Sequence, residues 1–284
     1  MKLSDFNIKN EEEIFSLEQR GEVPFLQYLK FQEIDWIRHC FTTRGGGVSK
    51  GIFESMNLSF TRGDDKEAVE ENFRRIAKAM GTDERSFVFT DQTHTTNVRK
   101  VSRADIGAGI WKERGYRDVD GLITDEAGIV LSTFYADCVP LYFIDVRHHA
   151  IGLSHSGWRG SVGRMGKVTI EAMRREYGTT GEDLLCAIGP SICMQCYEVS
   201  EDVAVLFERE FGERAKELLR QKKDEKYLLD LWRANEIVLE EAGVPSDRII
   251  TTNICTCCNP NLLFSHRASK GKRGNLAAFL SIAE

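Results

Sequence analysis

The sequence lacks the features of a membrane or secreted protein. Its longest apolar run, residues 128–144, is interrupted by Asp137 and Pro140, so it is not a membrane span. The first residues, MKLSDFNIKNEEEIF, are charged and contain no apolar stretch of signal-peptide length. Internal repeats, low-complexity stretches and obvious linkers are also missing. We therefore expect a cytoplasmic protein with a single domain over residues 1–284, in which residues 1–20 form a loose N-terminal arm or an edge hairpin.

The chain also lacks an excess of positive charge. Its formal net charge of −6 argues against a general nucleic-acid binder or a protein that lies on membranes, because both need a basic face. The apolar share of 42% and the charged share of 29% are those of a soluble globular protein. We expect neither a nucleic-acid nor a membrane partner, and a monomer, which is the default for a domain of this size.

Hydrophobic periodicity predicts interleaved helices and strands without a regular strand–helix–strand alternation. Asp64 and Glu67 resemble a capping box, and Gly81 ends the helix that they begin. The chain therefore belongs to the α+β class, with mixed sheets covered by helices. Helices are predicted over residues 64–80, 161–177, 201–211 and 229–242. Strands are predicted over 86–90, 97–101, 121–124, 150–154, 184–188 and 249–254, with two more in 129–145 separated near 136–140.

Three residues carry most of the functional information: His94, Cys138 and His155. Each lies in a short polar or glycine-containing segment that follows or ends a predicted strand. Two imidazoles and one thiolate form the kind of three-ligand set that holds catalytic zinc and leaves a fourth position open. If the three side chains meet in space, the protein is a metal-dependent enzyme.

Other interpretations of these residues remain open. Cys138 is also compatible with a buried structural thiol, or with a nucleophile paired with His94 or His155 as in cysteine hydrolases. Two histidines and one cysteine also describe a blue-copper centre. However, the nearest histidine after Cys138 is ten residues on, and the six histidines include no His-x-His pair. Zinc is therefore favoured over copper.

His155 is followed by a glycine-containing turn and the start of a predicted helix. Helix N-termini attract anions, and Arg159 and Arg164 add positive charge there. We expect an anion site next to the presumed metal ligand, the alternative being a tight turn with solvated arginines.

The eight cysteines favour reduced thiols or metal ligands over disulfides, because no signal peptide is recognised. The pair Cys193 and Cys196 and the group Cys255, Cys257 and Cys258 offer a second zinc site. The 58 residues between Cys196 and Cys255 are far from zinc-ribbon spacing, so the sequence leaves this question open.

At the three segments that contain His94, Cys138 and His155, the chain resembles the YfiH-like family, which is also named for its laccase domain or as multicopper polyphenol oxidase. The resemblance extends from about His39 to Leu280. Further shared motifs are FTTRGGGVS (41–49), MNLS (56–59), DVDGLIT (118–124), AIGPSI (187–192), CYEV (196–199), LDLWRAN (229–235), CT (255–256) and FSHR (264–267). The segment after Arg267 departs from the pattern of many members, so neither Arg267 nor Arg273 is assigned to substrate binding.

The resemblance implies a single catalytic domain with α-β-β-α layers and zinc bound by His94, Cys138 and His155. It also implies phosphorolysis of adenosine, inosine, guanosine or methylthioadenosine, and hydrolytic deamination of adenosine. Purine nucleosides and inorganic phosphate are then the partners. Alternatives are a copper-dependent polyphenol oxidase of the laccase type, a Cys-His hydrolase and a non-catalytic zinc module that serves a partner protein.

Physical reasoning suggests roles for further residues in such a site. Zinc together with Arg44 or Arg159 would hold the phosphate, since both carry the required positive charge. Asp137 or Asp120 would transfer protons. Asn57 and Gln92 are candidate polar contacts to substrate, although hydrogen bonds to loop backbone are equally expected of them. The deaminase signature H-x-E with P-C-x-x-C is absent, so deamination would use another architecture.

Overall fold

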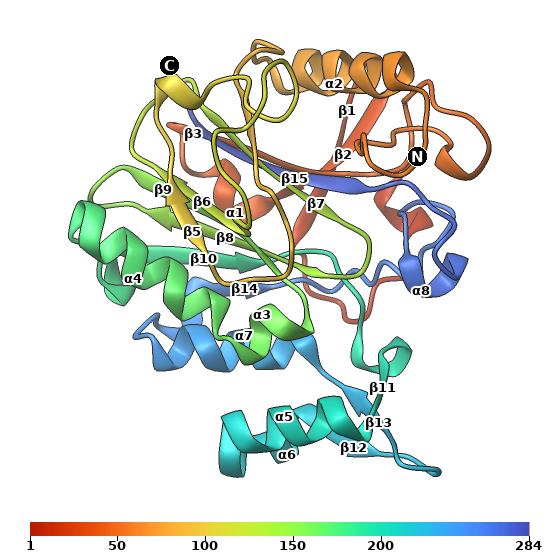
Figure 1. Ribbon diagram of the computed structural model, residues 1–284, viewed down its shortest axis with the longest axis vertical. Coiled ribbons are helices and arrows are strands. Elements are labelled where there is room, and N and C mark those ends of the chain that lie inside the picture. The colour runs from red at the N-terminus through yellow and green to blue at the C-terminus, as the bar shows by residue number, and fades with distance from the viewer. Residues whose placement is uncertain (284) are drawn as a thin grey trace.

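The structure, a computed structural model, describes residues 1–283. Two mixed sheets lie face to face, and helices cover their outer faces, which gives the α-β-β-α layers of an α+β fold (Figure 1). Across the first sheet the strands run β1 (Phe15–Arg20), β2 (Val23–Tyr28), β3 (Ile37–Thr42), β15 (Leu276–Ile282), β7 (Val130–Tyr135) and β4 (Phe87–Phe89). Across the second they run β14 (Ile249–Thr251), β10 (Leu184–Ile188), β8 (Val139–Asp145), β9 (Ala150–Ser156), β6 (Gly121–Thr124) and β5 (Val98–Lys100).

Most neighbouring strands are antiparallel, whereas β4 with β7, β5 with β6 and β10 with β14 are parallel. The region 129–145 forms β7 and β8 with a break at residues 136–138, as its β-branched and aromatic residues predicted. Residues 15–20 form β1, which pairs antiparallel with β2 at the edge of the first sheet.

Helix α2 (Lys66–Met80) covers the first sheet through Val69, Phe73 and Ile76, which share one face at helical spacing. Gly81 ends it in the left-handed conformation, as predicted. Its cap is Asp65 rather than Asp64, because the Asp65 side chain accepts the Ala68 N–H at 3.0 Å, whereas Asp64 accepts the amide of Asn57. The other helices are α1 (Leu29–Gln32), α3 (Trp158–Val162), α4 (Met165–Tyr177), α5 (Glu201–Phe211), α6 (Ala215–Leu218), α7 (Leu231–Glu241) and α8 (His266–Ser269).

Helices α4 and α7 cover the second sheet, on the side opposite to α2 (Figure 1). The single helix predicted over 161–177 is wrong, because Arg164 adopts a left-handed conformation with φ 56° and separates α3 from α4. A small third sheet of β11 (Glu198–Ser200), β13 (Lys226–Leu229) and β12 (Leu219–Gln221) extends below the body together with α5 and α6. No helix among residues 1–283 is long and apolar enough to cross a bilayer.

Candidate metal centre and its cavity

The structure brings His94, Cys138 and His155 together. His94 lies in the loop between β4 and β5, Cys138 lies directly before β8, and His155 lies in β9. Because β8 and β9 are antiparallel with Pro140 opposite His155, the start of β8 is next to the end of β9. One ligand atom from each of the three side chains lies within 4.8 Å of the other two. This spacing is suitable for binding one metal ion.

Asp120, which directly precedes β6, holds two of these ligands in position through hydrogen bonds. Its carboxylate is fully buried and accepts a hydrogen bond from Nδ1 of His155 at 2.8 Å. It also accepts the backbone N–H groups of Thr93, His94 and Thr95 at 3.0, 3.2 and 3.0 Å. One carboxylate therefore fixes both the His94 loop and the ring of His155. Since Nδ1 is bound to Asp120, Nε2 is the nitrogen of His155 that remains for a metal.

The charges in this group support one another. Burial alone would favour the neutral forms, but the neighbouring histidines lower the pKa of Cys138 to about 6. Burial likewise opposes a charged His155, yet the Cys138 thiolate and the Asp120 carboxylate raise its pKa to about 9. Despite its burial, the pKa of Asp120 is lowered by its bonds to His155 and the loop. The thiolate, which is the metal-binding form of cysteine, is therefore available near neutral pH.

Three residues around the group have positive φ angles, a backbone conformation that residues other than glycine rarely adopt. His94, Asp118 and Asp137 have φ angles of 66°, 54° and 91°. Asp137 is held in this conformation because its carboxylate accepts the Thr256 hydroxyl at 2.6 Å and the Arg267 N–H at 2.7 Å. These bonds place the following residue, Cys138, toward the two histidines.

The absence of a side chain at Gly157 keeps the space between the ligands open. A Cβ atom at this position would lie 3.1 Å from Sγ of Cys138 and 3.2 Å from Cδ2 of His94. Both distances are tighter than ordinary van der Waals contact. The donors thus surround a space that a single methyl group would partly fill.

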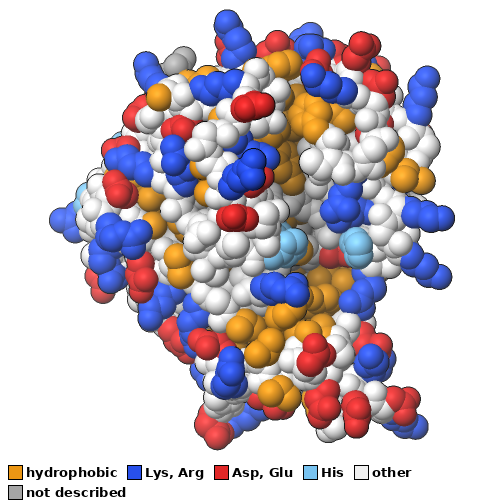
Figure 2. All heavy atoms as spheres, in the orientation of Figure 1, with side chains coloured by type: hydrophobic (Ala, Val, Ile, Leu, Met, Phe, Trp, Pro, Cys, Tyr) orange, Lys and Arg blue, Asp and Glu red, His pale blue; other side chains and the backbone are white. Residues whose placement is uncertain are grey.

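His94, Cys138 and His155 line a cavity of about 370 Å³. Its aromatic wall consists of Phe60, Phe89 and Phe134, and its basic side chains are Arg62, Arg114 and Arg273. Figure 2 shows this face of the molecule with hydrophobic side chains in a hollow and basic and histidine side chains at its edge. Further lining residues are Leu58, Ser59, Thr61, Thr90, Asp91, Gln92, Gly109, Ala136 and Asn275.

The arginines of the cavity differ in how far their charge is neutralised. Arg114 forms an ion pair with Asp91 at 2.6 Å. Arg273 is buried, and its Nε has no hydrogen-bond partner among the described residues. Burial and the nearby Arg62 lower the pKa of Arg273 to about 10. Arg62 and Arg273 therefore make this part of the cavity attractive to an anion.

Of the six further residues predicted to bind phosphate, transfer protons or contact substrate, only Gln92 lines the cavity. Its amide bonds both the N–H and the C=O of Phe134, at 2.7 and 2.8 Å, so it holds the aromatic wall. Asn57 is fully buried, and its Oδ1 accepts the Asn275 N–H at 2.9 Å. Arg44 donates to the backbone oxygens of Glu54 and Pro260 and does not reach the cavity. Asp137 and Arg159 do not line the cavity either.

The two arginines of the anion site expected at the helix after His155 do not line the cavity, so that site stays a prediction. Arg159 lies over the ring of Trp158, with 4.2 Å between its guanidinium carbon and the ring centre. Arg164 forms ion pairs with Glu210 and Glu241. Neither charge faces the cavity. The basic side chains that line the cavity come from other loops: Arg62 follows β3, Arg114 lies between β5 and β6, and Arg273 precedes β15. Sequence reasoning missed Arg62 because no local pattern distinguishes a loop arginine that lines a cavity from one that faces solvent.

The same chain resembles known proteins over most of its length. A family model described as "Multi-copper polyphenol oxidoreductase laccase" matches residues 38–283. The purine nucleoside phosphorylase YlmD of Bacillus subtilis is 35% identical over 245 residues, which are 86% of this chain and 88% of that protein. A protein named adenosine deaminase RL5, from an unknown prokaryotic organism, is 33% identical over 85% of this chain and 93% of its own length. The crystal structure of YlmD from Geobacillus stearothermophilus has a TM-score of 0.89 at 33% identity and covers 96% of this chain and 100% of its own.

Proposed function

Since this chain belongs to the YfiH-like family, whose model is described as multi-copper polyphenol oxidoreductase laccase, we propose that it is a zinc-dependent purine nucleoside phosphorylase that also deaminates adenosine. Its substrates are adenosine, inosine, guanosine and methylthioadenosine, with inorganic phosphate as the second substrate of phosphorolysis. Relatives named purine nucleoside phosphorylase and adenosine deaminase support both reactions.

One observation carries the proposal: the three donor side chains share a single cavity with Arg62 and Arg273. Phosphorolysis joins an anion to the C1′ atom of ribose while the purine leaves. The two arginines supply positive charge that holds phosphate at the site of reaction. The aromatic wall of Phe60, Phe89 and Phe134 offers flat apolar surface against which a purine packs.

The residues present fit a divalent metal ion. His94, Cys138 and His155 would hold it, because their donor atoms lie within 4.8 Å of one another and Asp120 orients His155 from behind. A bound zinc ion supplies Lewis acidity and lowers the pKa of a bound water to about 7. The protein holds the substrates against this centre in the shared cavity.

The carboxylates considered for proton transfer are occupied in the structure. Asp120 accepts five hydrogen bonds: from His155, from three backbone N–H groups of the His94 loop and from the Thr95 hydroxyl. Asp137 accepts bonds from Thr256 and Arg267 and does not line the cavity. We therefore assign both to positioning, Asp120 for the histidines and Asp137 for Cys138.

Donor chemistry supports zinc over copper at this centre. A blue-copper site adds a weak axial methionine to two histidines and a cysteine. No methionine is among the described residues that line this cavity. Residues 1–283 contain one further metal-type group, and it consists of cysteines rather than the histidines that additional copper ions would need.

The proposal is tested with purified full-length protein, adenosine and inosine, with and without inorganic phosphate. Free base should appear only with phosphate, and Cys138→Ala should lower kcat/KM by ~10³-fold, because losing a ligand removes several kcal/mol of transition-state stabilisation. Cys257→Ala, which replaces a half-buried cysteine outside both ligand groups, is the matched control.

Separate outcomes identify the alternatives. Unchanged turnover by Cys138→Ala would reject the metal mechanism. Oxygen-dependent oxidation of phenols by the copper-loaded protein, without nucleoside cleavage, would favour the oxidase. Stoichiometric zinc without any turnover would favour a non-catalytic module.

A further inference from the structure

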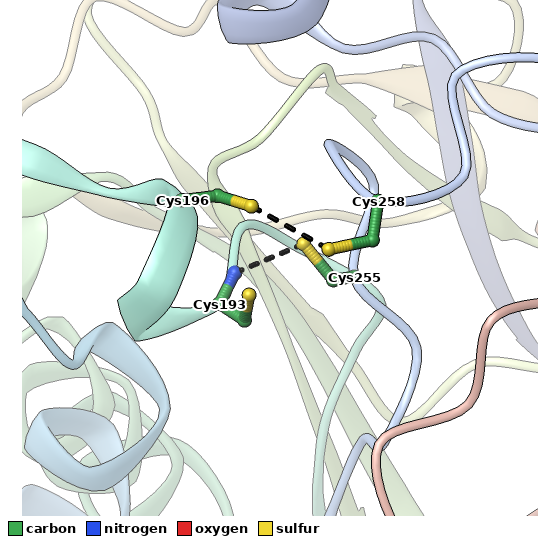
Figure 3. Close-up of side chains that lie close together, drawn as sticks. All are labelled: Cys193, Cys196, Cys255 and Cys258. Atoms are coloured by element: carbon green, nitrogen blue, oxygen red, sulfur yellow. Dashed lines mark hydrogen bonds between the residues drawn. The ribbon is translucent and has the colours of Figure 1, made fainter.

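Five cysteines lie between β10 and β15, and the side chains of four of them come together in space. They are Cys193 and Cys196, at the turn Met194–Cys196 after β10, and Cys255 and Cys258, in the loop after β14 (Figure 3). The two strands are parallel neighbours, and a bridge between Ser191 and Cys255 continues their alignment. The intervening residues form the small third sheet and α5 to α7, so the long sequence gap does not separate the two pairs in space.

The four sulfur atoms have the spacing of ligands to one ion. All lie within 4.8 Å of one another, and Sγ of Cys196 is 3.4 Å from Sγ of Cys258. Four Zn–S bonds of about 2.3 Å in a tetrahedron place the sulfurs about 3.8 Å apart. An iron–sulfur cluster would hold its cysteines farther apart, because several iron and sulfide ions lie between them. We propose that Cys193, Cys196, Cys255 and Cys258 bind a structural Zn²⁺ ion.

The surroundings of the sulfurs suit a zinc tetrathiolate. The backbone N–H of Cys193 donates to Sγ of Cys255 at 3.2 Å. The ammonium group of Lys9 lies 3.1 Å from Sγ of Cys258. Four thiolates around a divalent ion leave an excess of negative charge, and both donors offset it. Lys9 is itself held in place, since its N–H bonds the backbone oxygen of Asn253 at 2.9 Å.

The neighbours of these cysteines hold the loop of the other ligand group. The Ile192 N–H donates to the backbone oxygen of Asp137 at 3.0 Å, and the Thr256 hydroxyl bonds its carboxylate at 2.6 Å. Ile192 precedes Cys193, and Thr256 follows Cys255. The zinc ion therefore acts as a clamp: by fixing both cysteine loops, it holds Asp137 and hence Cys138 in place.

Cys257 lies between two of the proposed ligands but is not among the four converging sulfurs. It therefore provides a matched control, because its replacement removes one thiol from the same loop. Cys138→Ala removes one of the three ligands of the His94, Cys138 and His155 group, so that any zinc that remains is bound by the cysteines. The proposal is therefore tested by metal content, without measuring nucleoside turnover.

The test measures metal by mass spectrometry in full-length protein expressed in zinc-replete medium and dialysed against metal-free buffer. We expect one equivalent of zinc in Cys138→Ala, one in Cys138→Ala/Cys257→Ser and less than 0.1 in Cys138→Ala/Cys258→Ser. X-ray absorption at the zinc edge of Cys138→Ala should show sulfur alone at about 2.3 Å.

The absorption measurement decides the matter even if the Cys258→Ser variant fails to fold. A first shell that contains nitrogen would place the zinc at the two histidines and overturn the proposal. Metal-free Cys138→Ala, iron in place of zinc, or a disulfide between Cys196 and Cys258 in the unreduced protein would overturn it as well. Because nucleoside turnover is not measured, failure here leaves the proposed activity standing, and loss of that activity leaves this result standing.

Discussion

The two groups of metal-type ligands differ in what their surroundings leave free. His94, Cys138 and His155 provide three donors beside a cavity of about 370 Å³, and a buried carboxylate supports them. The four-cysteine group provides four donors, lies at the junction of two loops and contributes nothing to that cavity. Three ligands beside open space suit chemistry, whereas four identical ligands complete a coordination sphere and suit stability. The number of donors and the neighbouring space therefore separate the two roles.

The largest effects are expected when one ligand from each group is replaced and the activity and stability of the two variants are compared. Cys138→Ala should lower kcat/KM for nucleosides by ~10³-fold but change the melting temperature by little. Cys258→Ser should lower the free energy of unfolding by roughly 3 kcal/mol, because zinc binding contributes to folding. That loss corresponds to a fall of ~5 °C in melting temperature for a chain of this size. Scanning calorimetry and kcat/KM of both variants provide the measurements, and equal melting temperatures would contradict the assignment.

The Asp120 carboxylate, which bonds His155, has no counterpart in the four-cysteine group. Its removal should therefore affect only the site of His94, Cys138 and His155. Asp120→Asn should weaken metal binding and activity by about 10–100-fold, because a ligand without its partner loses orientation and basicity. Competition with a zinc chelator measures the affinity. Asp118→Asn, which alters a nearby exposed carboxylate that bonds Thr93 rather than a ligand, is the control. A similar loss in both variants would show that the effect is not specific to His155.

His39 tests whether burial alone makes a histidine functional. It is 3% exposed, as is His155, but it packs against Tyr28 and Phe31 and accepts the Tyr28 N–H at 2.8 Å. Burial lowers its pKa to about 3. The unfolded chain, with a pKa near 6.5, binds the proton more readily than the folded one. The stability that His39 contributes is therefore complete above pH 6.5 and decreases as the pH falls toward 3.

Between pH 6.5 and 5, His39→Gln should reduce the pH dependence of the free energy of unfolding by about 1.4 kcal/mol per pH unit, and it should leave activity intact at neutral pH. Urea unfolding at several pH values measures this slope. His149→Asn replaces an exposed histidine and should leave the slope unchanged. If His39→Gln showed the same dependence of unfolding free energy on pH as the unmodified protein, the proposed effect of burial on the pKa of His39 would be wrong.

The smallest effect is expected at the edge of the cavity. Arg62→Ala should raise the KM for phosphate roughly fivefold with little change in kcat, because it removes charge that binds the ground state and transition state alike. Phosphate titration at saturating inosine measures it. Arg103→Ala, outside the cavity, should leave both constants unchanged. A fall in kcat alone would instead assign Arg62 to the chemical step.

Sequence reasoning succeeded where local pattern decides the structure. The apolar spacing of Val69, Phe73 and Ile76 predicted α2, and the β-branched run 129–145 predicted β7 and β8. It failed at Arg164, whose left-handed backbone separates α3 from α4 and whose side chain pairs with the distant Glu210 and Glu241. No periodicity in residues 161–177 contains that information.

The same division holds for the candidate site. The family resemblance singled out His94, Cys138 and His155, and the structure brings them together. The position of Arg273 in the cavity and the meeting of Cys196 with Cys258 depend on sheet order, which spacing along the chain does not reveal. Whether these groups bind zinc stays a prediction.

The position of β15 has a consequence for biosynthesis. This strand follows every other strand in the chain, yet it lies between β3 and β7 in the first sheet. On the ribosome, β3 and β7 therefore remain with unpaired backbone edges until residues 276–282 emerge. Such edges pair readily with other chains. Nascent copies on one messenger are thus most vulnerable to aggregation late in translation, when chaperone protection of these two edges has its greatest value.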